Sequence, residues 1–150
     1  MTLAEQIQKD TIAAMKERDA DRVAVLRMVS SAIKNEAIKV GGLGTVLTDP
    51  QTLAVLNREV KQRKDAATQY KEAGRPELAE KEEAELAIIE EYMPKGLSDE
   101  ALQSLVNEII TETGATTRAD MGKVMAAIKA KLENPADSAK AAQLVGQKLQ

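Results

Sequence analysis

Apolar residues recur every three or four positions along most of this chain, which is the spacing of one face of an α-helix. In the first half this pattern predicts four helices. Their stripes are Leu3, Ile7, Ala14 and Met15; Val23, Leu26, Ser30, Ile33, Ala37 and Val40; Leu53, Leu56, Val60, Ala67 and Tyr70; and Leu78, Leu86, Ile89 and Tyr92. Three further stripes follow: Leu102, Leu105, Val106, Ile109 and Ile110; Met121, Val124, Met125, Ile128 and Leu132; and Leu144, Val145 and Leu149.

Capping residues and proline mark where these helices begin, and glycine marks where several of them end. The predicted starts are Thr2 with Glu5, Asp19 or Asp21, Asp49 before Pro50, Pro76, Ser98, Thr117 with Asp120, and Asn134-Pro135 with Asp137. The predicted stops are Gly41-Gly42, Gly74 and Gly114. We therefore expect an all-α fold.

Pro94 and Gly96 interrupt the helical pattern after the fourth stripe. A proline followed closely by a glycine favours a connecting segment between two packed parts of a chain. We expect two domains, residues 1–94 and 95–150. The first is predicted to be a four-helix bundle-like domain, and the second a three-helix module.

The residue inventory excludes much of enzyme chemistry, because the chain contains neither cysteine nor histidine. Thiol nucleophiles, imidazole bases and zinc sites with sulfur or imidazole ligands are therefore ruled out. Gly41-Gly42-Leu43-Gly44 follows a helix and lacks a Lys-Ser/Thr pair, which disfavours a nucleotide site. The glutamates of residues 76–95 lack the pattern of a calcium loop or a di-iron motif. We predict no catalytic residues, cofactor or metal.

Charge alternates between consecutive helices in the first half. Residues 49–75 hold six basic and four acidic side chains, whereas residues 76–95 hold seven glutamates and two lysines. One interpretation is that two antiparallel neighbours carry complementary exposed faces. The other is a basic surface for a phosphate backbone, with Arg58, Lys61 and Lys64 as the candidate contacts.

In the second half, the basic side chains fall on or beside the non-apolar helix faces. The candidate phosphate contacts there are Arg118, Lys123, Lys129 and Lys131. Arg118 and Lys123 lie next to a predicted helix N-terminus, where free N–H groups favour an anion. Tyr70 and Tyr92 are the only aromatic residues, so RNA contact is expected to depend on shape and phosphates rather than on base stacking.

The N-terminal ten residues carry Glu5 and Asp10 and no apolar run, which is not typical of a signal or transit peptide. No stretch reaches the length of a membrane span, so we expect no membrane partner. A cytoplasmic location is the resulting prediction.

Five segments stand out along the chain, and they read LRMVSSAIKN at 26–35, EVKQRKD at 59–65, YKEAGRPELA at 70–79, IIEEYMPKGLS at 88–98 and DMGKVM at 120–125. Together these segments resemble one known family, the GatB/YqeY family. The resemblance runs through nearly the whole chain in the same order, which makes it more specific than any single motif here.

The resemblance implies a stand-alone helical protein whose C-terminal module is similar to the tail domain of the tRNA-dependent amidotransferase B subunit. In that enzyme the tail domain helps to hold aminoacyl-tRNA, and the amide-forming chemistry resides in other domains and another subunit. The family label, carbon-nitrogen ligase activity with glutamine as amido-N-donor, therefore exceeds what 150 residues of this composition can carry. We expect no independent enzyme activity.

The sequence departs from the family pattern before its last helix. The family often carries a Gly-basic-Ala-Asp-Gly segment where this chain reads ENPADS at 133–138, without either glycine. Two hypotheses remain open. The chain binds tRNA or an aminoacyl-tRNA complex through its basic residues, or its charged helices dock onto another protein without touching RNA.

Overall fold

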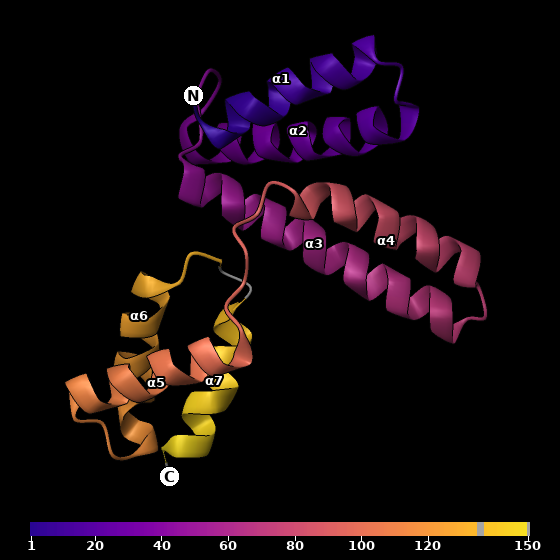
Figure 1. Ribbon diagram of the computed structural model, residues 1–150. Coiled ribbons are helices and arrows are strands. Elements are labelled where there is room, and N and C mark those ends of the chain that lie inside the picture. The colour runs from indigo at the N-terminus through magenta and orange to yellow at the C-terminus, as the bar shows by residue number, and fades with distance from the viewer. Residues whose placement is uncertain (135–136, 150) are drawn as a thin grey trace. The chain divides into compact units, whose positions relative to one another are not determined.

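The computed structural model describes residues 1–134 and 137–149, and the regular secondary structure of those residues is entirely helical (Figure 1). Its α-helices are α1 (Leu3–Lys16), α2 (Ala20–Gly41), α3 (Asp49–Glu72), α4 (Pro76–Glu90), α5 (Asp99–Thr113), α6 (Met121–Lys131) and α7 (Asp137–Lys148). A short 3-10 turn, η1 (Arg118–Asp120), leads into α6. The predicted all-α class is confirmed.

The chain divides into two compact units, Met1–Met93 and Pro94–Gln150. This division falls one residue before the boundary expected from the sequence. Each unit encloses its own cluster of buried apolar side chains.

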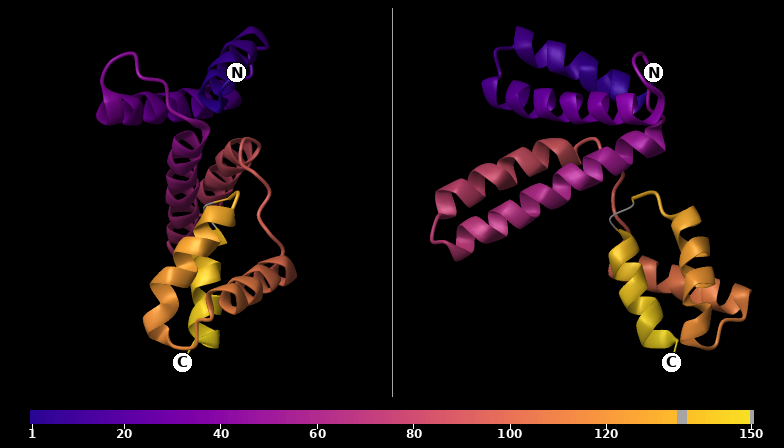
Figure 2. Two further views of the ribbon diagram at one scale, coloured as in Figure 1. Left: turned by 90° about the vertical axis from the view of Figure 1, so that its left-hand side faces the viewer. Right: turned by 180° about the vertical axis from the view of Figure 1, so that it is seen from behind.

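Two helical hairpins make up the N-terminal unit. Helices α1 and α2 lie side by side, as do α3 and α4, and α2 contacts both helices of the second hairpin (Figures 1 and 2). The far ends of α3 and α4 extend away from α1 and α2 (Figure 1). The predicted four-helix bundle is therefore not confirmed, because the hairpins do not run together along their whole lengths.

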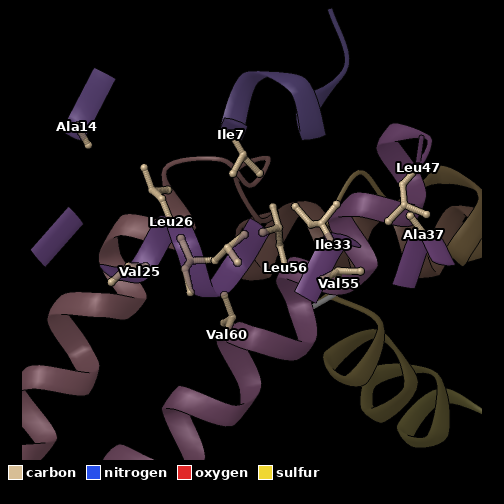
Figure 3. Close-up of a cluster of buried hydrophobic side chains, with 12 residues drawn as sticks. Ile7, Ala14, Val25, Leu26, Ile33, Ala37, Leu47, Val55, Leu56 and Val60 are labelled. Atoms are coloured by element: carbon tan, nitrogen blue, oxygen red, sulfur yellow. The ribbon is translucent and has the colours of Figure 1, made fainter. Parts of the chain in front are cut away.

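The core of this unit lies where the two hairpins meet. Ile7 of α1, Leu26 of α2 and Leu56 of α3 are fully buried and belong to one apolar cluster (Figure 3). Leu47, in the segment between α2 and α3, and Ile89 of α4 belong to the same cluster. Burying such side chains stabilises the unit by roughly 1.5–3 kcal/mol each relative to leaving them exposed.

Helix boundaries follow the predicted caps with two corrections. The cap of α3 is Thr48, whose hydroxyl accepts the Gln51 N–H, so Asp49 is the first helical residue rather than the cap. Asp49 instead accepts a hydrogen bond from the Leu3 N–H at 2.8 Å. Helix α4 ends at Glu90 rather than at Tyr92. Pro94 explains this early end, because a residue before proline avoids the helical conformation and the chain must turn beforehand.

Three positions of the predicted apolar stripes do not belong to the core. Met15, Val40 and Leu78 are exposed. Each lies in the first or last turn of its helix. Periodicity predicts which side of a helix is apolar, but it does not predict how far along the helix a neighbour covers that side.

In the C-terminal unit, α5, α6 and α7 each contact the other two. The buried cluster takes Leu102, Val106 and Ile109 from α5, Val124 and Ile128 from α6, and Ala141 and Val145 from α7, together with Ala115 and Leu149. The Asp137 carboxylate at the start of α7 accepts the Leu97 N–H at 3.0 Å. Lys140 of α7 also pairs with Asp99 of α5. These contacts fix the N-terminal ends of α5 and α7 next to each other.

Tyr92 ties the end of α4 to the first hairpin. Its hydroxyl donates to Asp10 Oδ2 of α1 at 2.6 Å, and the Gln6 amide donates to the other oxygen of that carboxylate at 2.8 Å. Partial burial, and then the hydrogen bond to Asp10, raise the pKa of Tyr92 to about 12. The fold therefore favours the neutral phenol.

Because folding raises this pKa, the stabilisation by Tyr92 is expected to be complete below pH 10 and to be lost between about pH 10 and 12. Titration of the tyrosinate absorbance should show a step near pH 12 that belongs to Tyr92. Tyr92→Phe should remove this step, whereas Tyr70→Phe should leave it in place. Absence of a step near pH 12 in the native protein would contradict this hydrogen bond.

Candidate nucleic-acid interface

Four of the sequence-predicted contacts lie on one short stretch of the C-terminal unit. Arg118 is in η1, and Lys123, Lys129 and Lys131 are in α6, all with exposed side chains. At about 100° per residue, Lys129 and Lys131 flank the buried stripe of α6 on opposite sides, and Lys123 points away from it. The three lysines therefore surround the helix and do not share a single flat face.

Lys131 is the least available of these cations. Its ammonium lies 3.8 Å from a Glu108 oxygen and 4.0 Å from a Glu112 oxygen, both on α5. Lys123 instead directs its ammonium to the Thr113 carbonyl oxygen at 3.5 Å. Arg118 and Lys129 contact no carboxylate in the described part of the chain.

The start of α6 already carries an anion of its own. The Asp120 carboxylate accepts the Thr116 N–H at 3.0 Å and the Thr117 N–H at 3.4 Å. These two hydrogen bonds, followed by the nearby Lys123 charge, lower the pKa of Asp120 below its ordinary value. A phosphate at this position would therefore have to depend on the Arg118 and Lys123 side chains more than on backbone N–H groups.

The other three candidates lie on α3, in the N-terminal unit. Arg58, Lys61 and Lys64 are all exposed, and successive members are offset by about 60° around the helix. Arg58 pairs with Glu36 of α2 at 3.1 Å. Lys61 and Lys64 contact no carboxylate among the residues that the structure describes.

Arg58 also borders a polar groove between α2 and α3 that sequence reasoning missed. Two adjoining hollows of about 250 and 430 Å³ share Ala32, Asn35 and Glu59. Arg27 and Lys39 of α2 line its two ends. The available sequence signal was the four-residue spacing of Arg27, Ser31, Asn35 and Lys39, which forms a polar stripe beside the apolar one.

A buried arginine lies beneath this groove. Arg63 Nη1 donates to a Glu59 oxygen at 2.8 Å, and Arg63 Nη2 faces the Met28 sulfur at 3.8 Å. Arg63 Nε lies 3.6 Å from a Glu85 oxygen of α4 and makes no hydrogen bond within the described residues. The sequence signal for its burial was its spacing, because Arg63 lies three residues after Val60 and four before Ala67, on the apolar side of α3.

Other classes of site find little support in the geometry. Across residues 1–134 and 137–149, no three carboxylates converge as ligands for a metal ion. None of the helices in that range is both long and apolar enough to cross a bilayer. Pro135 and Ala136, within the segment that departs from the family pattern, lie outside the described residues.

Comparisons with known proteins identify one family and two relatives. The family model described as YqeY-like protein matches residues 4–149. An uncharacterised protein of Schizosaccharomyces pombe is 34% identical over 95 residues, covering 62% of this chain and 73% of the relative. Altered inheritance of mitochondria protein 41, mitochondrial, from Clavispora lusitaniae is 30% identical over 115 residues, covering 75% of this chain and 65% of the relative.

Proposed function

This chain belongs to the YqeY-like protein family, and on that premise we propose that it is a non-catalytic helical module that associates with tRNA or an aminoacyl-tRNA complex. The contacts assigned to this role are Arg118, Lys123, Lys129, Lys131, Arg58, Lys61 and Lys64. Residues 1–94 and 95–150 act as separate domains in this proposal, and the chain works in the cytoplasm. No catalytic residue is assigned.

The observation that carries the proposal is the number of candidate cations left without an anionic partner. Five of the seven contact no carboxylate among the described residues: Lys61, Lys64, Arg118, Lys123 and Lys129. An exposed cation without a partner breaks no ion pair when it contacts a phosphate. Its contact with the phosphate also releases condensed counterions from the RNA. Lys131 and Arg58 would first have to leave their glutamates.

Binding of this kind should be weakly selective for base sequence. Both tyrosines lie in the N-terminal unit, so the α6 region offers no aromatic ring on which a base could stack. Shape and phosphate spacing are what remain for recognition. The folded body of a tRNA presents both.

Binding of total tRNA is expected to weaken steeply with salt, and Arg118→Ala with Lys123→Ala is expected to reduce that dependence. Removing two phosphate contacts should lower the slope of log K against log salt by roughly 1.5 to 2 and weaken binding about tenfold or more. Fluorescence anisotropy between about 50 and 200 mM salt measures both quantities.

The matched control is Arg75→Ala with Lys81→Ala, which removes the same charge from exposed positions outside the candidate set. Equal losses in the two double variants would show a nonspecific charge effect and contradict the assigned site. Absence of tRNA binding at low salt would reject direct recognition by this chain.

Protein docking is the second candidate function, and one observation favours it. Ile12 and Met15 are exposed and lie three residues apart on one side of α1. Exposed apolar groups on adjacent helix positions are typical of a helix-binding or partner-binding surface. A partner retained after nuclease treatment, and lost on Ile12→Ser with Met15→Ser, would support docking over RNA association.

A further inference from the structure

The N-terminal unit contains an apolar pocket that neither the family nor the RNA proposal explains. It has a volume of about 310 Å³ and lies between the start of α1, the C-terminal half of α2 and the segment 42–47. A volume near 300 Å³ is at the lower end of the range for small-molecule sites. The pocket is formed entirely within one unit, so its shape depends only on contacts inside that unit.

The walls of the pocket are mostly aliphatic. Ile33, Ala37 and Leu47 are buried and form its inner part. Leu43 and Val46, also lining residues, are 86% and 60% exposed. Apolar side chains on an exposed loop add nothing to the core, so their place beside an apolar cavity indicates a role in covering a ligand.

The loop that carries these two side chains has a defined backbone. Gly42 and Gly44 have φ angles of +85° and +83°, a region that residues with a side chain rarely adopt. The Gly42 N–H donates to the Ile38 carbonyl oxygen at 2.8 Å, and the Thr45 N–H donates to the Gly42 carbonyl oxygen at 3.3 Å. The loop is thus held against the end of α2 by its own hydrogen bonds.

The two charged side chains at the pocket, Lys34 and Glu5, differ in whether they have a partner. Lys34 lines the pocket, and its ammonium pairs with no carboxylate in the described range of the chain. The one lining carboxylate, Glu5, accepts the Thr2 N–H at 2.8 Å and so belongs to the cap of α1. An entering ligand therefore finds an aliphatic cavity and one uncommitted positive charge.

We propose that this pocket binds a medium-chain aliphatic carboxylate, with the chain against Ile33, Ala37 and Leu47 and the carboxylate near Lys34. A charged head group on an aliphatic chain is the chemistry that matches both features. Leu43 and Val46 then lose their exposed apolar surface on binding. This site does not depend on the RNA proposal, and it uses none of the RNA candidates.

Calorimetric titration of the full chain with saturated carboxylates of about 6 to 12 carbons tests the proposal. Each added methylene should tighten binding roughly fourfold, until the cavity is filled and the gain stops. Alkyltrimethylammonium ions of equal chain length should bind at least about tenfold more weakly. A gain that continues without limit, or cation binding as tight as carboxylate binding, would overturn the site.

Surface variants locate the site without disturbing the core. Lys34→Glu should weaken carboxylate binding at least about tenfold, and Lys39→Glu, on the same helix but outside the pocket, should not. Leu43→Ser with Val46→Ser should also weaken it, in contrast to Ile12→Ser with Val40→Ser, which changes apolar positions that are 51% and 53% exposed and do not line the pocket. Circular dichroism confirms folding of each variant.

Sedimentation of the same proteins tests whether the apolar loop covers a ligand or contacts a second copy of the chain. Self-association that is lost on Leu43→Ser with Val46→Ser, together with no carboxylate binding, would assign the apolar loop to a dimer contact and overturn the proposal. Carboxylate binding by the monomer, sensitive to Lys34→Glu, supports it.

Discussion

Replacing Arg63 with alanine is expected to lower the free energy of unfolding of the N-terminal unit by about 3 kcal/mol. The Arg63 side chain is only 7% exposed, and it holds Glu59 at 2.8 Å and Glu85 at 3.6 Å. Without the guanidinium, two mostly buried carboxylates would face each other with no cation between α3 and α4. Their remaining exposure, 18% and 20%, allows some rehydration and keeps the loss at the lower end for a broken buried pair.

Urea denaturation followed by tyrosine fluorescence measures this loss. Both tyrosines lie within residues 1–93, so the signal reports the N-terminal unit. Lys61→Ala, a charge removal at an exposed position of the same helix, should change stability by less than about 0.5 kcal/mol. Similar effects for Arg63→Ala and Lys61→Ala would show that the buried pair is not formed.

Combining Arg63→Met with Glu59→Gln and Glu85→Gln should recover much of the stability that is lost in Arg63→Ala. The reason is that the cost arises from uncompensated carboxylates, and neutral side chains of similar size remove that cost. If the triple variant is as unstable as Arg63→Ala, the loss comes from the missing ion pairs and hydrogen bonds of the guanidinium and not from uncompensated carboxylates.

Leu56→Ala is the second substitution with a large expected effect. It should lower the free energy of unfolding by about 3 kcal/mol, within the roughly 2–5 kcal/mol typical of such truncations. Leu56 is completely buried and lies in the cluster where the two hairpins meet. Shortening its isobutyl side chain to a methyl group leaves a cavity between α2 and α3 that neighbouring helices can close only by moving. Leu43→Ala, at an 86% exposed position, is the control and should be nearly neutral.

Leu56→Ala also tests the proposed independence of the two domains. Tyrosine fluorescence should show early unfolding in Leu56→Ala, while far-UV circular dichroism should retain a later transition from α5, α6 and α7 at its original midpoint. A coincident shift of both transitions would show that the two domains unfold together and would contradict their independence.

The candidate site contains some residues whose exposure could be predicted from the sequence and others whose contacts could not. Exposed lysines such as Lys61 and Lys129 were predictable, because a charged residue outside the apolar stripe of an amphipathic helix generally faces solvent. Arg63 lies within the arc of the α3 apolar stripe, three residues after Val60 and four before Ala67, but only the return of α4 with Glu85 supplies the second carboxylate beside the buried arginine. The polar stripe of α2 was visible in the sequence, but the groove between Arg27, Lys39 and Arg58 depends on which side of α2 meets α3.

The sequence by itself determined the helices and most of their ends. The capping box of Thr2 and Glu5, the Ser98 cap and the left-handed Gly114 all lie where the sequence predicted them, because each acts through residues within one turn. Only the tertiary structure decided how the hairpins meet, which apolar positions stay exposed and which carboxylate of α4 meets the buried arginine. Those outcomes depend on contacts between residues far apart in the chain, and the periodicity of a single helix carries no information about its partner.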